Sequence, residues 1–242
     1  MMELSRLVLN PRSRDVQRDL SDCQGLHRRI LSAFPAAPAG GVKAREHFGV
    51  LYRVDVQPRM GTPVLLVQSS STPDWNALPA TYMLPATAAP NPATKSVAAA
   101  YAALTPGASL RFRLRANPTK RVSPRGEGER NLNKWAGKRI DLRTEEEQIA
   151  WLRRKGAQGG FQLEAVQTSA DIADVRWMPE GRLTGRRQDN DGDRRTLTFR
   201  SVLFEGRLVV TDAEQFRQTL AAGIGSGKAY GFGLLSVAPG GG

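Results

Sequence analysis

Two histidines are the side chains of this sequence best suited to acid–base chemistry near neutral pH. His27 lies in a stretch of helical periodicity and is followed by Arg28 and Arg29. Such arginines would hold a phosphate and lower the pKa of the imidazole. Two interpretations are open at this point: His27 is a satisfied core histidine, or it acts as a general acid or base while Arg28 contacts the phosphate. His47 has no comparable setting, and we expect it in a loop or at a strand edge.

Metal and thiol chemistry are not expected. The only cysteine, Cys23, excludes an internal disulfide, and with two histidines it excludes a structural Cys/His zinc site. A buried thiol is the favoured interpretation of Cys23, and a Cys/His pair with His27 is the alternative. The acidic run at residues 189–193 is not a calcium loop, because Arg194 stands at the glycine position and Arg200 at the bidentate glutamate. We predict no metal and no small-molecule cofactor.

Positive charge is in excess and is concentrated. The 242 residues carry 35 Lys and Arg against 23 Asp and Glu, a formal net charge of +12. Nucleic acid is the commonest intracellular polyanion, and its phosphates require such clusters. Scattered, solvated charge is the alternative. We predict nucleic-acid contacts from two clusters, which contain Arg111, Arg113, Arg115, Lys120 and Arg121 in the first and Arg182, Arg186, Arg187, Arg194 and Arg195 in the second.

Glycines recur between residues 223 and 233, in a run that fails both common phosphate-binding patterns. Ala229 replaces the Ser or Thr of the P-loop, and Lys228 stands where the last glycine of G-x-G-x-x-G belongs. The run is better explained as a loop between a helix and the last strand, whose backbone N–H groups face phosphates. We predict contacts from Gly225, Gly227 and Lys228, and a flexible turn is the alternative.

The residues above need elements to position them, and hydrophobic periodicity indicates which segments these are. The first half is predicted to contain a strand at residues 4–9, helices within 12–34, and strands at 48–56 and 63–69. Residues 79–108 are rich in Pro and Ala, and we expect a linker with little regular structure there.

The second half opens with a strand at residues 109–116, whose apolar residues face a core while its three arginines face outward. A Thr144-Glu-Glu-Glu147 capping box predicts the start of a helix. The remaining predicted elements are a strand at 161–168, a strand pair at 196–210 with a turn at 205–206, a helix at 212–222 and a strand at 233–237.

The order of these elements is β-α-β-β-α-β in the second half and β-α-β-β with a weak remainder in the first, which we interpret as the ferredoxin-like motif twice. The predicted fold class is α+β, with two tandem ferredoxin-like (RRM-like) domains and antiparallel sheets. We expect an N-terminal domain at residues 1–85, a Pro/Ala-rich linker at 86–108, and a C-terminal domain at 109–242 with a basic hairpin and the glycine-rich loop.

Segments along nearly the whole chain carry a resemblance to one family. They are residues 4–11, 26–28, 64–68, 73–75, 110–121, 202–208 and 223–239. In this order they resemble the CasE-type CRISPR repeat endoribonucleases of type I-E systems, in the RAMP superfamily. The resemblance implies cleavage of the CRISPR precursor transcript at the 3′ base of each repeat hairpin, with His27 as the active-site histidine. Members often carry a tyrosine three residues before that histidine and a lysine five residues after it, where Gln24 and Ser32 stand here.

The resemblance also implies partners and a mechanism. We expect the chain to bind the CRISPR repeat RNA stem-loop, to stay on its product in the Cascade complex with other type I-E subunits, and to use no membrane. The RNA carries its own nucleophile, because the 2′-OH can attack the adjacent phosphorus without a metal. The expected products are a 5′-OH and a 2′,3′-cyclic phosphate or 3′-phosphate. A non-catalytic RNA-binding subunit is the alternative function, and a small-molecule enzyme that uses the glycine loop is a third.

The cellular location is predicted from three features. The longest aliphatic run, residues 64–67, is far shorter than the ~20 residues of a membrane span. The N-terminus has no apolar signal-peptide core, and a single cysteine is typical of a reducing compartment. We expect a soluble, cytoplasmic protein.

Overall fold

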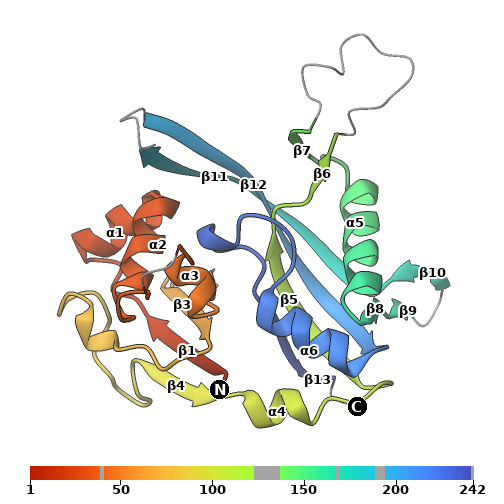
Figure 1. Cartoon of the computed structure of the whole chain (residues 1–242), viewed down its shortest axis with the longest axis horizontal. Helices are drawn as coiled ribbons and strands as arrows, with labels where there is room; N and C mark the ends of the chain where they lie inside the picture. The colour runs from red at the N-terminus through yellow and green to blue at the C-terminus, as the bar shows by residue number, and fades with distance from the viewer. Residues whose placement is uncertain (39–40, 123–136, 167–168, 189–193, 241–242) are drawn as a thin grey trace.

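The computed structural model describes residues 1–242 except 39–40, 123–136, 167–168, 189–193 and 241–242. Two antiparallel sheets lie side by side, one built from each half of the chain (Figure 1). The first half contains β1 (Glu3–Val8), α1 (Arg14–Ser21), α2 (Cys23–Leu31), α3 (Ala44–His47), β2 (Leu51–Val56), β3 (Pro63–Ser69), the 3₁₀ helix η1 (Trp75–Ala77), β4 (Ala93–Ser96) and α4 (Ala98–Ala102). The second half contains β5 (Ser109–Ala116), β6 (Thr119–Arg121), β7 (Arg139–Asp141), α5 (Glu145–Gln158), β8 (Phe161–Leu163), β9 (Ala165–Val166), β10 (Ser169–Ala173), β11 (Val175–Gln188), β12 (Arg194–Val210), α6 (Ala213–Ala222), the 3₁₀ helix η3 (Lys228–Tyr230) and β13 (Leu235–Pro239).

The first sheet has the strand order β2-β3-β1-β4. Leu7 of β1 lies opposite Leu65 of β3, and both side chains are buried. Leu26 and Ile30 of α2 belong to the same core. The three strands predicted before residue 70 are confirmed as β1, β2 and β3, although β2 begins at Leu51 and not at residue 48.

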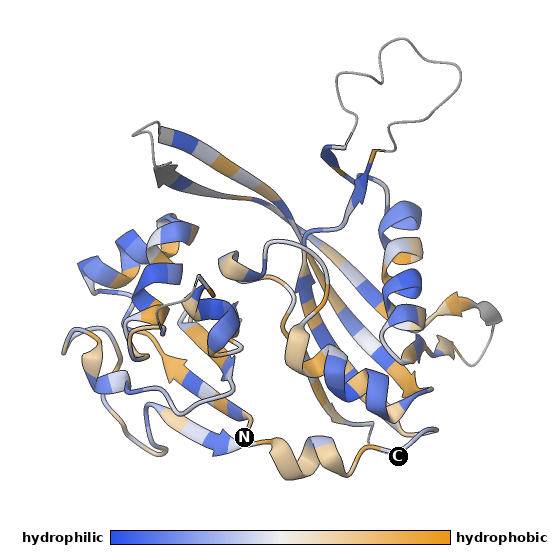
Figure 2. Cartoon of the chain, viewed as in Figure 1, coloured by the Kyte–Doolittle hydropathy of each residue, from blue (hydrophilic) through white to orange (hydrophobic). Residues whose placement is uncertain are grey.

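The second sheet has the order β11-β12-β5-β13, and β8 also pairs with β12. Phe112 of β5 packs with Trp151 of α5 and Phe216 of α6. Hydrophilic and hydrophobic residues alternate along β12 (Figure 2), as expected for a strand with one buried face. α5 begins at the predicted capping box, in which the side chains of Thr144 and Glu147 accept bonds from each other's backbone N–H. Both sheets have the second, third, first and fourth strands of the motif in that order, so two ferredoxin-like folds are confirmed.

Two segments within residues 79–108 correct the expectation of little regular structure. β4 pairs with β1 at the edge of the first sheet, from Ser96 opposite Glu3 to Ala93 opposite Arg6. Its short, largely exposed sequence has no hydrophobic alternation that could predict it. α4 forms in an alanine-rich stretch, and alanine has the highest helix propensity. The first sheet therefore extends past residue 85, and the division into domains stays a prediction.

Other elements also differ from the prediction. The expected strand pair with a turn at 205–206 is one continuous strand, β12. Its residues before and after Gly206 pair with neighbouring strands without a turn. A Cβ at Gly206 would lie 2.1 Å from the backbone oxygen of Asp174, so close approach, and not a turn, requires glycine there. His47 ends α3 rather than lying in a loop or at a strand edge. The predicted strand at 161–168 is divided into β8 and β9, and its last two residues lie outside the described part.

The two halves contact each other through β2, β3 and the glycine-rich segment before β13. The Tyr52 hydroxyl donates to the backbone oxygen of Ala229 at 2.9 Å. The Gln68 amide donates to the backbone oxygen of Leu220 at 2.8 Å. Both donors are buried residues of the first sheet. These bonds fix the glycine-rich segment and the end of α6 against the first half of the chain.

Candidate active site and nucleic-acid interface

His27 lies on α2, where this helix packs against η3 of the glycine-rich segment. α2 begins after Asp22, whose carboxylate accepts a hydrogen bond from the backbone N–H of Gln24 at 3.1 Å. The imidazole meets the ring of Tyr230 edge-on, with the ring centroids 6.2 Å apart. Its Nδ1 is buried and has no hydrogen-bond partner within the part of the chain that the structure describes. This unsatisfied nitrogen distinguishes His27 from the satisfied core histidine of the alternative interpretation.

The Arg45 guanidinium acts electrostatically on both His27 and Lys228. Burial, and then the nearby Arg45 guanidinium, lower the pKa of His27 to about 4. Burial, Arg45 and Lys155 lower the pKa of Lys228, and Glu46, which pairs with Arg45 at 3.1 Å, acts in the opposite direction. A place where positive groups disfavour one another's charge is a place that attracts an anion. We call His27, Arg45, Lys228 and Tyr230 the His27 cluster.

Arg45 and Tyr230 are not among the site residues predicted from the sequence. Arg45 lies in α3, a helix of four residues that no periodicity indicates. The available signal for Tyr230 is its position in the glycine-rich run, two residues after Lys228. Both side chains are placed by contacts between distant segments, which leave no local pattern.

The glycine-rich run folds as a loop that contains η3. Gly225 and Gly227 have φ angles of +81° and +73°, a region that side chains other than glycine rarely adopt. A Cβ on Gly225 would lie 2.9 Å from the Trp151 side chain, and one on Gly227 would lie 2.9 Å from that of Phe232. Conformation and close packing thus explain both glycines, and their contacts with a phosphate stay a prediction.

A cationic cavity with a volume of about 470 Å³ opens beside this loop. None of the described residues that line it is acidic. Lys120 also pairs with Glu147 at 3.7 Å, and Arg121 donates to the backbone oxygen of Gly137 at 3.1 Å. The structure thus brings Lys120, Arg121 and Lys228 of the predicted set together, with Gly225 beside them. The basic residues that line the cationic cavity are Lys120, Arg121, Arg139, Arg154, Lys155 and Lys228.

The hairpin of β11 and β12 carries the second predicted basic cluster. Arg182, Arg186 and Arg195 are exposed. The side chains of Arg187 and Arg194, and the acidic run between them, lie outside the described residues. The hairpin extends from the second sheet toward α1 and α2 (Figure 1), so its arginines reach the half of the chain that holds His27.

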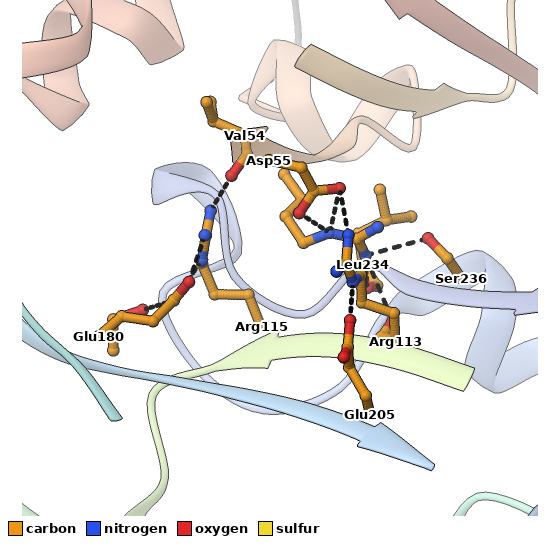
Figure 3. Close-up of polar contacts among 10 residues, drawn as sticks. Val54, Asp55, Arg113, Arg115, Glu180, Glu205, Leu234 and Ser236 are labelled. Atoms are coloured by element: carbon orange, nitrogen blue, oxygen red, sulfur yellow. Dashed lines mark hydrogen bonds and ion pairs between the residues drawn. The ribbon is translucent and has the colours of Figure 1, made fainter. Parts of the chain in front are cut away.

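Two of the three β5 arginines are bound to carboxylates near the junction of the two halves (Figure 3). Arg115 donates to both oxygens of Glu180, each at 2.6 Å, and to the backbone oxygen of Val54 in the other half. Arg113 pairs with Glu205. These contacts correct the expectation that all three arginines form a free cationic face. RNA contact through Arg113 and Arg115 stays a prediction.

Arg53 of β2 completes this junction network, and its partners Asp55, Leu234 and Ser236 are labelled in Figure 3. Its side chain is 3% exposed and donates to Asp55 at 2.9 Å and to the Ser236 hydroxyl at 3.0 Å. It also donates to the backbone oxygens of Arg113 and Leu234, at 3.2 and 3.3 Å. One buried guanidinium of the first half therefore binds two strands of the second sheet.

Arg111 and Arg28 lie apart from the cationic cavity. Arg111 is exposed on β5 and donates to the backbone oxygen of Pro239 at 3.3 Å. Arg28 follows His27, but successive residues of a helix point in different directions. It is exposed and lines a separate depression beside Asp22. The structure therefore places neither arginine with Lys228, and phosphate binding by Arg28 stays a prediction.

Cys23 is a free, buried thiol, as the favoured interpretation predicts. Burial, and then the charge of Asp22, raise its pKa to about 11, so the thiol is protonated at neutral pH and forms no ion pair with His27. Among the described residues, no group of three or more His, Cys, Asp and Glu could hold a metal ion. In the same part of the chain, no helix is both long and apolar enough to cross a membrane.

Comparison with known proteins gives matches over nearly the whole chain. The family model described as CRISPR associated protein matches residues 2–239. The CRISPR-associated endoribonuclease Cse3 of Thermus thermophilus is 39% identical over 247 residues, which cover 98% of this chain and 100% of that protein. The CRISPR system Cascade subunit CasE of Escherichia coli K12 is 36% identical over 136 residues, 55% of this chain and 59% of that protein.

Solved structures agree with these matches in fold. Cse3 bound to a 19-nucleotide RNA has a TM-score of 0.75 and 36% identity, and the match covers 98% of this chain and 100% of that one. Thermus thermophilus Cse3 bound to an RNA that represents a pre-cleavage complex has a TM-score of 0.72 and 36% identity, with 98% and 99% covered. The chain belongs to the CRISPR-associated protein family, among the CasE-type CRISPR repeat endoribonucleases.

Proposed function

We propose that this chain is a metal-independent endoribonuclease that cleaves CRISPR precursor transcripts at the 3′ base of the repeat stem-loop and yields mature guide RNAs. The observation that carries this proposal is the His27 cluster. Its imidazole is uncharged at neutral pH, and within the described residues Nδ1 has no partner. Lys228 of the same cluster lines the cationic cavity. The relative named CRISPR-associated endoribonuclease, 39% identical to this chain, supports the proposal.

The RNA supplies the nucleophile of the proposed reaction. His27 accepts the proton of the ribose 2′-OH while this oxygen attacks the adjacent phosphorus, and the bond from phosphorus to the 5′-oxygen breaks. Lys228 and Arg45 stabilise the negative charge that develops on the phosphate oxygens. The imidazolium formed in the first step is a suitable acid to protonate the leaving 5′-oxygen. The products are a 5′-OH and a 2′,3′-cyclic phosphate, which water can open to a 3′-phosphate.

The RNA stem is proposed to lie across the cationic cavity and the exposed arginines of the hairpin. A-form RNA hides its base edges in a deep, narrow groove, so backbone contacts and shape dominate recognition. The relative named Cascade subunit CasE supports retention of the product and assembly with type I-E Cascade subunits. We place this activity in the cytoplasm.

The test is single-turnover cleavage of a repeat hairpin RNA by the purified chain in excess EDTA. We expect cleavage to persist in EDTA and to fail on a hairpin with a 2′-deoxy nucleotide at the scissile position, because the nucleophile is then missing. His27→Ala should lower the rate by about 10²–10⁴-fold, the usual contribution of one acid or base, while RNA affinity stays within a few-fold.

His47→Ala is the matched control, since His47 is the only other histidine and is exposed on α3. It should cleave like the wild type. A magnesium requirement, or cutting of the deoxy substrate, would contradict attack by the 2′-OH. Binding without any cleavage by the wild type would favour the alternative of a non-catalytic RNA-binding subunit.

A further inference from the structure

One arm of the β11–β12 hairpin is docked on the start of α2, the helix that carries His27. Gly185 of β11 is buried there. A Cβ built on Gly185 would lie 2.5 Å from Cys23 Sγ and 3.1 Å from Asp22 Oδ1. The φ of Gly185 is not positive, so lack of space, rather than backbone conformation, accounts for the glycine. The hairpin and α2 are therefore in direct van der Waals contact at this point.

The carboxylate of Asp22 joins the same two segments by hydrogen bonds. Its Oδ1 accepts from the backbone N–H of Gln24, in the first turn of α2, at 3.1 Å. The same oxygen accepts from the backbone N–H of Arg186, on β11, at 3.1 Å. A single side chain thus caps the helix and anchors the hairpin backbone, and neither bond depends on an exposed, flexible side chain.

The other arm of the hairpin is linked to His27 through the ring of Tyr230. Phe199 of β12 packs on Tyr230, with ring centroids 4.9 Å apart, and Tyr230 in turn meets the imidazole of His27. Phe199 lies opposite Leu183 in the ladder, two residues before Gly185. The two contacts therefore lie two positions apart along the ladder of one hairpin.

We propose that Asp22, Gly185 and Phe199 are positioning residues for the cleavage reaction, because they fix the imidazole of His27 relative to the RNA-binding hairpin. This inference rests on the proposed function. Arg182 and Arg186 project from the same hairpin, within three residues of Gly185. RNA held by these arginines is located relative to His27 through the hairpin itself. The hairpin thus contributes to the rate of the chemical step as well as to affinity.

The experiment shifts the docking contact without removing any charge. In Gly185→Ala the new methyl group meets Cys23 Sγ, and the hairpin must move away from α2. We expect the single-turnover rate at saturating protein to fall about 10²-fold, as for a misplacement of about 1 Å, with an unchanged dissociation constant for the repeat RNA. Cys23→Ala alone should cleave like the wild type. The double variant should recover most of the lost rate, because the sulfur no longer blocks the methyl group.

Asp22 and Phe199 provide a second test, which does not depend on whether Gly185→Ala folds. Asp22→Asn keeps an oxygen that accepts both N–H groups and should retain the wild-type rate, whereas Asp22→Ala should lose rate at constant affinity. Phe199→Leu should behave like Asp22→Ala. Thr184→Ala is the matched control, because Thr184 is the exposed neighbour of Gly185 on β11. Melting curves of each variant exclude global unfolding.

Three outcomes would overturn the inference: wild-type rates in Gly185→Ala and Asp22→Ala, equal losses of rate and affinity, or no recovery on adding Cys23→Ala to a folded Gly185→Ala variant. Equal losses would mean that the hairpin acts only by binding RNA. Failure of the wild type to cleave would instead contradict the proposed function, so the two failures are distinguishable.

Discussion

At the scale of single residues, His27 is kept uncharged by its surroundings and not by a hydrogen-bond partner. Burial and the Arg45 guanidinium both disfavour the imidazolium. An uncharged imidazole can accept a proton at neutral pH, but a pKa of about 4 makes it a weak base. A phosphate bound between Arg45 and Lys228 would offset their charges and raise the pKa of His27. The base would then become stronger when the substrate is in place.

The first prediction follows from the effect of Arg45. Replacing Arg45 by Gln removes a cation that disfavours the imidazolium, so the pKa of His27 should rise from about 4 toward its ordinary value of 6.5. The rise should be partial, because burial is the larger cause. The measurement is an NMR titration of the His27 ring in the free protein. Arg59→Gln, which removes an exposed arginine in the turn after β2, should leave the titration unchanged.

The same shift has a consequence for stability. Below pH 6.5 the unfolded chain binds a proton at His27, and the folded chain does not until about pH 4. This group therefore lowers the free energy of unfolding as the pH falls through that window. Arg45→Gln should narrow this pH window and reduce the loss of unfolding free energy within it. An unaltered His27 titration in Arg45→Gln would show that the guanidinium does not act on the imidazole.

At the scale of elements, regular periodicity was enough to predict β1, β3 and β5, but it predicted neither β11 nor the continuity of β12, and it gave no contacts between strands. The alternation in β5 correctly places Phe112 in the core and Arg113 and Arg115 on the other face. It cannot show that Glu180 of β11 and Val54 of β2 meet Arg115, since both are more than 60 residues away in the sequence. β4 escaped prediction for the same reason, because pairing with β1 and not its own sequence makes it a strand.

The candidate site also contains residues with a local sequence signal and residues whose place depends only on the fold. His27 and Lys228 could be predicted, because a histidine beside arginines and a lysine in a glycine-rich run are local signals. Arg45 could not, because its role comes from the approach of α3 to the His27 cluster in the fold. Gly185 gives no signal either, since the need for glycine arises from Cys23 on a distant helix.

The second prediction concerns the junction of the two halves. Arg53→Met should lower the free energy of unfolding by about 3 kcal/mol, because it leaves buried polar partners of a charged group unsatisfied. These partners are Asp55, Ser236 and two backbone oxygens. Arg111→Met, on the exposed face of β5, should change it by no more than about 0.5 kcal/mol. Urea unfolding measures the unfolding free energy of each variant. Equal values for Arg53→Met and Arg111→Met would show that the Arg53 network does not stabilise the fold.

At the scale of the whole molecule, the basic residues behind the net charge of +12 have different surroundings in different places. Arg53, Arg113 and Arg115 are bound to acidic and backbone groups near the junction of the halves. The cationic cavity, by contrast, has no acidic residue in its described lining. The affinity of the protein for RNA should therefore depend on where a positive charge lies and not on the total charge.

The third prediction tests this dependence. Each phosphate contact contributes about 0.7–0.9 to the slope of log K against log salt. Replacing both Lys120 and Arg121 of the cationic cavity by Gln should lower the magnitude of that slope by roughly 1.5 for the repeat hairpin. Replacing Arg12 and Arg59 by Gln removes the same charge from exposed positions in the first half and should leave the slope unchanged. Binding of the hairpin to each double variant at several salt concentrations gives the slopes. Equal reductions in both variants would mean that RNA responds to the total charge, and the proposed path through the cationic cavity would be wrong.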